Sequence, residues 1–337
     1  MRPARSQSVR HPKDYPTLMT AMAANKEGYW EKVPIGKKDM SVYDTYFKKE
    51  LPSGYVWDED IQISDELRQF FDDHYIESDV KLIFTEEFLK WSCGTLRVGI
   101  RKSTGELVAF ATGQIYEVKI GKEMKKYNFI NNLMTHSGYR GLGFAPFIMD
   151  RVYRLGCEKL GCESVIMSRV GNEKLRGKVC TMSAAYLMIT KKEILGYNPT
   201  SKLFPIPKTH KMKRLTPAET IERISKFLSS KGMLYVPSEA DLSHDFIYCY
   251  GDAKSFVVMI KKEGYSVKTG EKFTAGYIQY IHGDDFLCAG VAAKESNVDI
   301  IYFTGDKFLV HSTGDIKINI HVINDEVKCF SPGDVAL

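Results

Sequence analysis

Apolar residues recur at helical spacing in two stretches of the first hundred residues. After Ser64, the apolar positions Leu67, Phe70 and Phe71 are three or four apart, which predicts an amphipathic helix capped by Ser64. The stretch FTEEFLKW at 84–91 has acidic residues in its first turn and an apolar side. It is predicted to form a second helix.

The period then changes to the alternation that is typical of strands. Residues 96–120 alternate around a turn at STGE, which predicts a β-hairpin, and residues 125–136 form the next expected strand. Behind it, the glycine-rich bend SGYRGLG leads into an apolar-periodic helix, and residues 163–168 supply another short strand. The predicted order over 96–168 is therefore β-β-β-α-β.

The second half repeats this theme. A helix is predicted from Thr216, followed by strands at 254–262 and 272–281 with a turn between them. Alternating segments at 308–313 and 315–323 close the chain. A helix followed by a β-meander thus occurs in both halves, which predicts a pseudo-duplicated α+β fold.

Composition shifts suggest where these halves begin and end. Residues 1–14 are polar and basic and are predicted to form a flexible tail. Residues 198–217 are rich in Pro, Lys and Thr, as is typical of a linker. The predicted organisation is therefore an N-terminal half at 15–197 and a C-terminal half at 218–337.

The overall composition is that of an ordinary globular protein, with 337 residues, 44% of them hydrophobic and 26% charged. The net charge of +5 is mild and both signs alternate, so nucleic-acid binding is not expected. Seven cysteines without a CxxC pair indicate a reducing compartment, with neither a disulfide framework nor a zinc site. Neither a signal peptide nor a membrane span is expected, so the predicted location is cytoplasmic.

The segment Arg140-Gly-Leu-Gly-Phe-Ala145 is the strongest local motif, because it lies between a predicted strand and a predicted helix. Glycines let the backbone curl around phosphate oxygens, and free amides at a helix N-terminus bind an anion. An ordinary strand-to-helix turn would have the same sequence, so the motif alone leaves both interpretations open.

Several further stretches occur in the same order as motifs of glycylpeptide N-tetradecanoyltransferases, the N-myristoyltransferase family. KKYNFINNLMTHSGYRGLGFAP resembles the family's Lys-Lys-Met-x-Glu-Ile-Asn-Phe-Leu-Cys-x-His signature and the Arg-x-x-x-x-Ala-Pro that follows it. Other similar segments are EGYWEKVPI, LPSGYVWDEDI, HYIESDVKLIFTEEFLKW, KLFPIP and MKRLTP. The resemblance implies two acetyltransferase-like (GNAT-like) halves that share one saddle-shaped mixed β-sheet with flanking helices.

The resemblance also implies roles for individual residues. The backbone amides of Asn132 and Leu133 would form an oxyanion hole, a role that a bulged strand can fill because its ladder exposes successive amides. Tyr29 and Trp30 would lie over the CoA, with simple core packing as the alternative. The remaining predicted contacts to the acyl-CoA come from Leu133, Met134, Thr135, Arg140, Gly141, Leu142, Gly143, Phe144 and Ala145.

Family members use their terminal carboxylate as the general base, which here would belong to Leu337. A glycine α-amine has a pKa near 8 and must lose a proton before it attacks the thioester. Ser168 would orient this amine, or would simply be a buried hydroxyl. The acidic residues implied in peptide binding are Glu77, Asp79 and Asp315.

The resemblance implies a compact, divergent member, because the sequence departs from the family pattern at two places. The family's Arg-Tyr-Trp-His stretch falls on Thr181–Ala184, and there is little room for a long helical insert between Tyr280 and Asp299. His136 matches a family histidine, but no catalytic role is assigned to it.

The implied activity is transfer of a myristoyl group from myristoyl-CoA to the N-terminal glycine of a peptide or protein, by a monomer without metal or stable membrane insertion. A short-chain N-acetyltransferase and a non-catalytic acyl-CoA-binding protein are the alternatives. The lack of a Cys–His pair favours direct attack over an acyl-enzyme.

Overall fold

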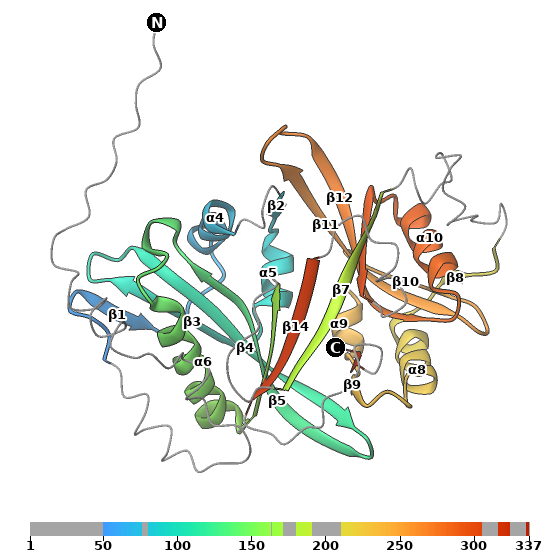
Figure 1. Cartoon of the computed structure of the whole chain (residues 1–337), viewed down its shortest axis with the longest axis horizontal. Helices are drawn as coiled ribbons and strands as arrows, with labels where there is room; N and C mark the ends of the chain where they lie inside the picture. Colours follow the sequence, from blue (N-terminus) through green and yellow to red (C-terminus); the bar gives the residue numbers. More distant parts are fainter. Residues whose placement is uncertain are drawn as a thin grey trace, which may run out of the picture.

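The computed structural model describes residues 50–75, 80–162, 164–170, 180–190, 210–304, 316–323 and 335–336 (Figure 1). Two elongated halves lie side by side and are joined through central strands. The predicted tail at 1–14 and most of the predicted linker at 198–217 lie outside the described residues.

The first half contains β1 (Tyr55–Asp58), α4 (Asp65–His74), β2 (Val80–Ile83), α5 (Glu86–Ser92), β3 (Leu96–Lys102), β4 (Leu107–Ile120), β5 (Glu123–Thr135), the 3₁₀ turn η1 (Ser137–Tyr139), α6 (Phe144–Leu160), β6 (Ser164–Val170) and β7 (Cys180–Thr190). The second contains β8 (Lys213–Arg214), α8 (Pro217–Phe227), β9 (Met233–Tyr235), α9 (Glu239–Leu242), β10 (Ile247–Gly251), β11 (Phe256–Ser266), β12 (Lys272–His282), α10 (Asp285–Ser296), β13 (Ile300–Thr304) and β14 (Ile316–Ile323). The described part ends with β15 (Val335–Ala336).

These two lists have the same order, and the pairing follows it. All described strands belong to one mixed sheet whose main path is β1-β3-β4-β5-β6-β14-β7-β13-β12-β11-β10-β8. If the path is read in reverse and each strand is replaced by its equivalent in the other half, the same strand order results. β5 is parallel to β6 as β12 is to β13, and the other pairs along this path are antiparallel. The predicted pseudo-duplicated α+β fold is confirmed.

The halves also exchange strands. β14 of the second half lies between β6 and β7 of the first half, while β7 pairs with β13 of the second. In the same way, β2 pairs with β11 and β9 pairs with β4. Each half therefore completes the sheet of the other, and neither half has a full sheet from its own strands.

The predicted helices begin where their capping residues indicate. Ser64 accepts a hydrogen bond from the Leu67 amide, and Thr85 accepts one from Phe88. Thr216 and Glu219 form a capping box at the start of α8, with Pro217 directly after the cap. These side chains satisfy amides that a helix leaves unpaired at its N-terminus.

Other elements were not predicted. α10 has little amphipathic character, because its run CAGVAA is almost entirely apolar and buried. The strands β2 and β9 have four and three residues, too few for a reliable alternation. The predicted strand at 308–313 lies outside the described residues.

Helices and apolar clusters cover the two faces of the sheet. α6 packs on β3, β4 and β5, and α10 packs in the same way on β10, β11 and β12. A further core cluster combines Phe71 and Leu89 of the first half with Ile224 and Phe256 of the second. Because this core contains residues of both halves, folding of one half depends on the other.

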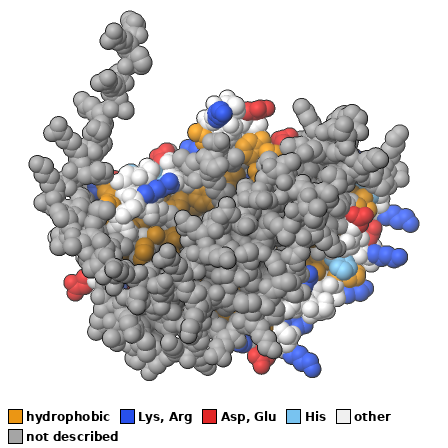
Figure 2. Space-filling view, in the orientation of Figure 1, with side chains coloured by type: hydrophobic (Ala, Val, Ile, Leu, Met, Phe, Trp, Pro, Cys, Tyr) orange, Lys and Arg blue, Asp and Glu red, His pale blue; other side chains and the backbone are white. Residues whose placement is uncertain are grey.

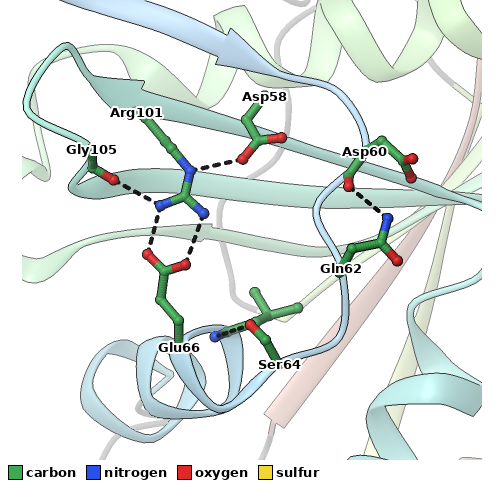
Figure 3. Close-up of polar contacts among 8 residues, drawn as sticks. Asp58, Asp60, Gln62, Ser64, Glu66, Arg101 and Gly105 are labelled. Atoms are coloured by element: carbon green, nitrogen blue, oxygen red, sulfur yellow. Dashed lines mark hydrogen bonds and ion pairs between the residues drawn. The ribbon is translucent and has the colours of Figure 1, made fainter.

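Arg101 of β3 fastens α4 to the first hairpin (Figure 3). Its guanidinium binds both carboxylate oxygens of Glu66 at 2.6 and 2.9 Å, and it also donates to Asp58 at 2.7 Å and to the carbonyl of Gly105 at 2.7 Å. The hydrogen bond from Arg101 lowers the pKa of the Glu66 carboxyl. Bidentate pairing fixes orientation as well as charge, so α4 has a defined position beside the hairpin.

A buried asparagine joins α6 to the sheet. Asn128 of β5 is fully buried, and its side-chain amide donates to the carbonyl of Val152 at 3.1 Å. A Cβ added at Gly156 would lie 2.2 Å from Nδ2 of Asn128, and one added at Gly113 would lie 2.5 Å from Oδ1. The two glycines therefore leave the space that this side chain occupies.

We predict that Gly156→Ala destabilises the protein, although alanine is the better helix former by about 0.5–1 kcal/mol. The added methyl overpacks against Asn128, which costs about 1–3 kcal/mol. Chemical denaturation should therefore show a lower free energy of unfolding. In an Asn128→Ala background the same substitution should be neutral or stabilising. A stabilising Gly156→Ala in the wild-type background would contradict this packing account.

Candidate functional site

The pairing of β4 with β5 is interrupted near the end of β5. Thr112 lies opposite Asn131 and Phe110 lies opposite Met134, so two residues, Asn132 and Leu133, face the single residue between Phe110 and Thr112. This count defines a β-bulge. The structure thus places a bulge at the residues that the sequence analysis expected to donate backbone amides.

Asn132 has a left-handed backbone conformation, with φ 52°. Asparagine tolerates this region better than most residues do, because its short side chain hydrogen-bonds locally. The equivalent pair, β11 and β12, also has a register shift, between Val258 and Met259, but no residue of β12 has positive φ. Each half therefore has a register shift at the equivalent pair of strands, but of these two pairs only β4 and β5 contain a left-handed non-glycine residue.

The Asn132 side chain contacts the end of α5. Its amide nitrogen donates to the carbonyl of Ser92 at 3.0 Å and to the Thr112 hydroxyl at 3.3 Å, and lies 3.7 Å from the Cys93 sulfur. The backbone amide of Asn132 donates to Oδ1 of Asn131 at 2.8 Å. The resemblance implied a role only for the Asn132 backbone, and it gave no sign of these side-chain contacts.

The surroundings of the bulge are apolar and neutral. Met134, Cys93 and Thr112 are buried, whereas the Leu133 side chain is 36% exposed. Burial raises the pKa of the Cys93 thiol to about 12, so it carries no charge at neutral pH. In such surroundings a developing negative charge interacts strongly with nearby amide dipoles.

The glycine bend follows directly after β5. Gly141 and Gly143 have φ of 81° and 82°, and a Cβ at Gly141 would meet no atom within 4 Å. Gly143 is the N-cap of α6 and supplies no side-chain hydrogen bond to the helix. Amides at an N-terminus without a side-chain cap, together with the helix dipole, favour an anion.

The second half provides an internal comparison. There, Gly283 has φ 107° and lies between β12 and α10, as the glycine bend lies between β5 and α6. Asp284 accepts a hydrogen bond from the Leu287 amide at 3.1 Å. This carboxylate caps the helix and would repel an anion, so of these two equivalent helices α6 is the one whose N-terminus suits an anion.

Two predicted cofactor contacts have other partners. The Arg140 guanidinium donates to the carbonyls of His74 at 2.6 Å and Thr135 at 3.3 Å, and so joins the bend to the end of α4. The Phe144 side chain is buried beside Tyr55, with ring centroids 4.9 Å apart. Only its backbone remains suited to an anion contact. Leu142 packs against the core beneath α6.

Histidines and charged residues support the bend. The rings of His74 and His136 have centroids 3.9 Å apart, and Nδ1 of His136 accepts from the Gly138 amide at 3.0 Å. Glu106 lies 3.8 Å from His136 and 2.7 Å from Lys102. These contacts give His136 a structural role, in agreement with the sequence analysis.

Several predicted residues lie outside the described part of the chain, namely Tyr29, Trp30, Glu77, Asp79, Asp315 and Leu337. The backbone of Ser168 is described in β6, opposite Ile320 of β14. β15, directly before Leu337, runs parallel to β9, and β9 runs along β4 from Ile120 toward Val118. The described end of the chain is therefore directed along β4 toward the bulge.

Charge and metal-binding groups add little to this picture. Basic and acidic side chains are interspersed at the right-hand margin of the view in Figure 2, on the side where Figure 1 shows α8 and α10. In the described part of the chain, no three His, Cys, Asp or Glu side chains gather closely enough to hold a metal ion. None of the described helices has the length and apolarity that a membrane span requires.

The duplicated sheet and its helices define the class of fold as GNAT-like. Residues 38–162 match the family model described as Myristoyl-CoA:protein N-myristoyltransferase, N-terminal domain. The chain is 28% identical over 163 residues to glycylpeptide N-tetradecanoyltransferase 1 of Arabidopsis thaliana. That match covers 39% of this chain and 37% of the relative, well under two thirds of its length.

Solved structures match over nearly the whole chain. A Saccharomyces cerevisiae N-myristoyltransferase with bound myristoyl-CoA has a TM-score of 0.71 at 15% identity, covering 93% of this chain and 99% of that one. A second crystal structure of the yeast enzyme with myristoyl-CoA gives 0.70 at 16% identity. The fold is therefore that of the N-myristoyltransferases, and the family-model match at residues 38–162 lies within this fold. The predicted resemblance and fold class are confirmed.

We predict that acid loosens the glycine bend through His74. Burial, and then the neighbouring His136 imidazole, lowers the pKa of His74 from its ordinary value of 6.5. The unfolded chain therefore binds this proton more readily than the folded protein, so His74 makes stability fall as the pH decreases through about 6.5. Hydrogen exchange at residues 137–143 should be faster at about pH 5.5 than at about pH 7.5, after correction for intrinsic rates.

A His74→Phe variant keeps an aromatic ring beside His136 without a titrating group, so its bend should show a smaller pH effect. His244→Phe is the matched control, because His244 stacks on Phe246, away from the bend. An equal pH effect in wild type and His74→Phe would contradict the assignment to His74.

Proposed function

We propose that this protein transfers a myristoyl group from myristoyl-CoA to the α-amine of an N-terminal glycine. The observation that carries the proposal is that two sites with backbone hydrogen-bond donors follow one another along a single stretch of chain. The β5 bulge presents backbone amides, and α6, whose N-terminus has no side-chain cap, begins at Phe144, nine residues after Thr135. One site suits a thioester oxygen, and the other suits the phosphates of CoA.

The bulge amides of Asn132 and Leu133 would bind the thioester carbonyl. As the amine attacks, charge moves onto this oxygen, and amides that are already oriented stabilise it without reorganisation. Removing one such donor costs an enzyme about 10²–10³ in kcat. In the free protein the Asn132 amide donates to Oδ1 of Asn131, so the acyl oxygen would replace that partner.

The glycine bend would hold the pyrophosphate of CoA. The backbone around Gly141, Gly143 and Ala145 can approach phosphate closely, while Arg140 holds the bend against α4. Leu133, Met134 and Thr135 lie between the two sites and would line the path of the pantetheine arm. Tyr29 and Trp30 remain candidates for covering the CoA.

The chemical step proposed is direct attack. The glycine ammonium gives a proton to the carboxylate of Leu337, and the free amine forms a bond to the thioester carbon. The tetrahedral intermediate loses its second amine proton to solvent and collapses, and the carbon–sulfur bond breaks. The departing CoA thiolate takes the proton held by Leu337, which restores the carboxylate. Ser168 would orient the amine, while Glu77, Asp79 and Asp315 would face the peptide.

The proposed setting is a cytoplasmic monomer acting on N-terminal glycine peptides. A non-catalytic acyl-CoA-binding protein is the second candidate. The hydrogen bond that occupies the Asn132 amide favours it, as does Thr181–Ala184 in place of the family's groove residues.

The first experiment tests turnover. Myristoyl-CoA incubated with a peptide beginning Gly-Ser should yield free CoA and a peptide heavier by one myristoyl group in the mass spectrum. The same peptide with an acetylated N-terminus should not react, because its amine is blocked. Acyl-CoA binding without transfer would favour the non-catalytic candidate, and preference for acetyl-CoA would favour an acetyltransferase.

A second experiment tests the base. Two residues added after Leu337 move the carboxylate away, so kcat should fall at least about 100-fold, within the range of general-base contributions, while acyl-CoA affinity is kept. A Leu337→Ala variant keeps the terminal carboxylate and is the matched control. Full activity in the extended protein would remove Leu337 from the mechanism.

A further inference from the structure

Asn132 has a backbone conformation that is rare among the described non-glycine residues. Asn132 and Asn297 are the non-glycine residues with positive φ among the described positions. A left-handed conformation costs an L-residue about 1–2 kcal/mol unless its surroundings compensate. At Asn132 the compensation comes from its own side chain, which bridges from β5 to the end of α5.

The bridge satisfies a carbonyl that a helix leaves unpaired. Ser92 is the last residue of α5, and its carbonyl has no partner further along the helix. Asn132 Nδ2 donates to it at 3.0 Å. This places a donor between the negative end of α5 and the bulge, where the helix dipole would otherwise disfavour an oxyanion.

The same side chain continues through Thr112. Asn132 Nδ2 donates to the Thr112 hydroxyl at 3.3 Å, and that hydroxyl donates to the Asn131 carbonyl at 3.1 Å. Thr112 is only 2% exposed, so water does not compete freely for these bonds. These two hydrogen bonds therefore connect the Asn132 side chain, through Thr112, to the backbone carbonyl of Asn131 at the bulge.

That carbonyl determines where the catalytic amide points. The Asn131 C=O and the Asn132 N–H belong to one planar trans peptide unit, so they point in opposite directions. Holding the carbonyl with Thr112 fixes the direction of the N–H. A donor displaced by about 1 Å loses on the order of 100-fold in rate, so this orientation matters for chemistry.

We propose that Asn132 and Thr112 are positioning residues, whose side chains form a clamp that orients the Asn132 amide toward the thioester oxygen. The inference rests on the proposed function, which requires those amides. It assigns a role to side chains where the resemblance implied only a backbone role. It also explains asparagine at 132, since this residue combines tolerance of positive φ with an amide that reaches Ser92 and Thr112.

Three variants test the clamp. Asn132→Gly keeps the left-handed backbone but removes the side chain, and Thr112→Val removes the hydroxyl while leaving the β5 sequence unchanged. Asn297→Gly is the matched control, because it changes an asparagine of φ 50° in the loop after α10. Thermal unfolding identifies the variants that remain folded.

The clamp predicts a split between kinetic constants. In Asn132→Gly and Thr112→Val, kcat should fall about 10- to 100-fold, while KM for myristoyl-CoA changes less than about 2-fold. Asn297→Gly should keep both constants. Wild-type kcat in both clamp variants would overturn the inference, and a change confined to KM would show a binding role instead.

A measurement without turnover separates this inference from the proposed function. Amide hydrogen exchange at Asn132, followed by NMR in the free protein, should be at least about 10-fold faster in Thr112→Val than in wild type. Unchanged exchange would overturn the clamp even if the enzyme is active. Faster exchange in a protein whose wild type transfers no acyl group would support the clamp as a structural device and reject the proposed function.

Discussion

The interruption of the β4–β5 ladder at Asn132 and Leu133 is the feature on which the other parts of the site depend. In a regular antiparallel ladder successive N–H groups of a strand point to opposite sides, so the amides of Asn132 and Leu133 could not both face one ligand oxygen. The bulge prevents this pairing locally, and the left-handed Asn132 sets its shape. α5 closes one side of the bulge through Ser92, and the glycine bend and α6 follow on the other.

The duplicated architecture explains how a local irregularity can be held in place. β14 and β7 cross into opposite halves, and β2 and β9 do the same at the hairpins. The core cluster that contains Phe71 also contains Phe256. A change of conformation in one half would break contacts with the other half, so β4 and β5 are held in place along most of their length. The second half repeats the register shift and the glycine, but its Asp284 caps α10.

Local features of this fold could be predicted from sequence because their causes are local. Ser64, Thr85 and Thr216 cap helices through bonds to residues three positions away, and the glycine bend shows positive φ where the motif required it. The exchange of β7 and β14 could not be predicted, since it depends on pairing between residues far apart in sequence. α10 was missed because its run CAGVAA is apolar and buried throughout, so no amphipathic period marks this helix. The sequence contained one weak indication of the clamp, which is the asparagine at 132 inside a predicted strand. Asparagine is uncommon in strands and is enriched among the non-glycine residues that have positive φ.

The central claim is that the bulge amides hold the acyl carbonyl, and the infrared frequency of that carbonyl tests it most directly. Myristoyl-CoA labelled with ¹³C at the thioester carbon gives a difference spectrum between labelled and unlabelled complexes that isolates this bond. The account predicts a stretch at lower frequency in the complex than in water, because two oriented amides polarise the carbonyl more than solvent does. A frequency equal to or above that in water, as in an apolar site without donors, would contradict it.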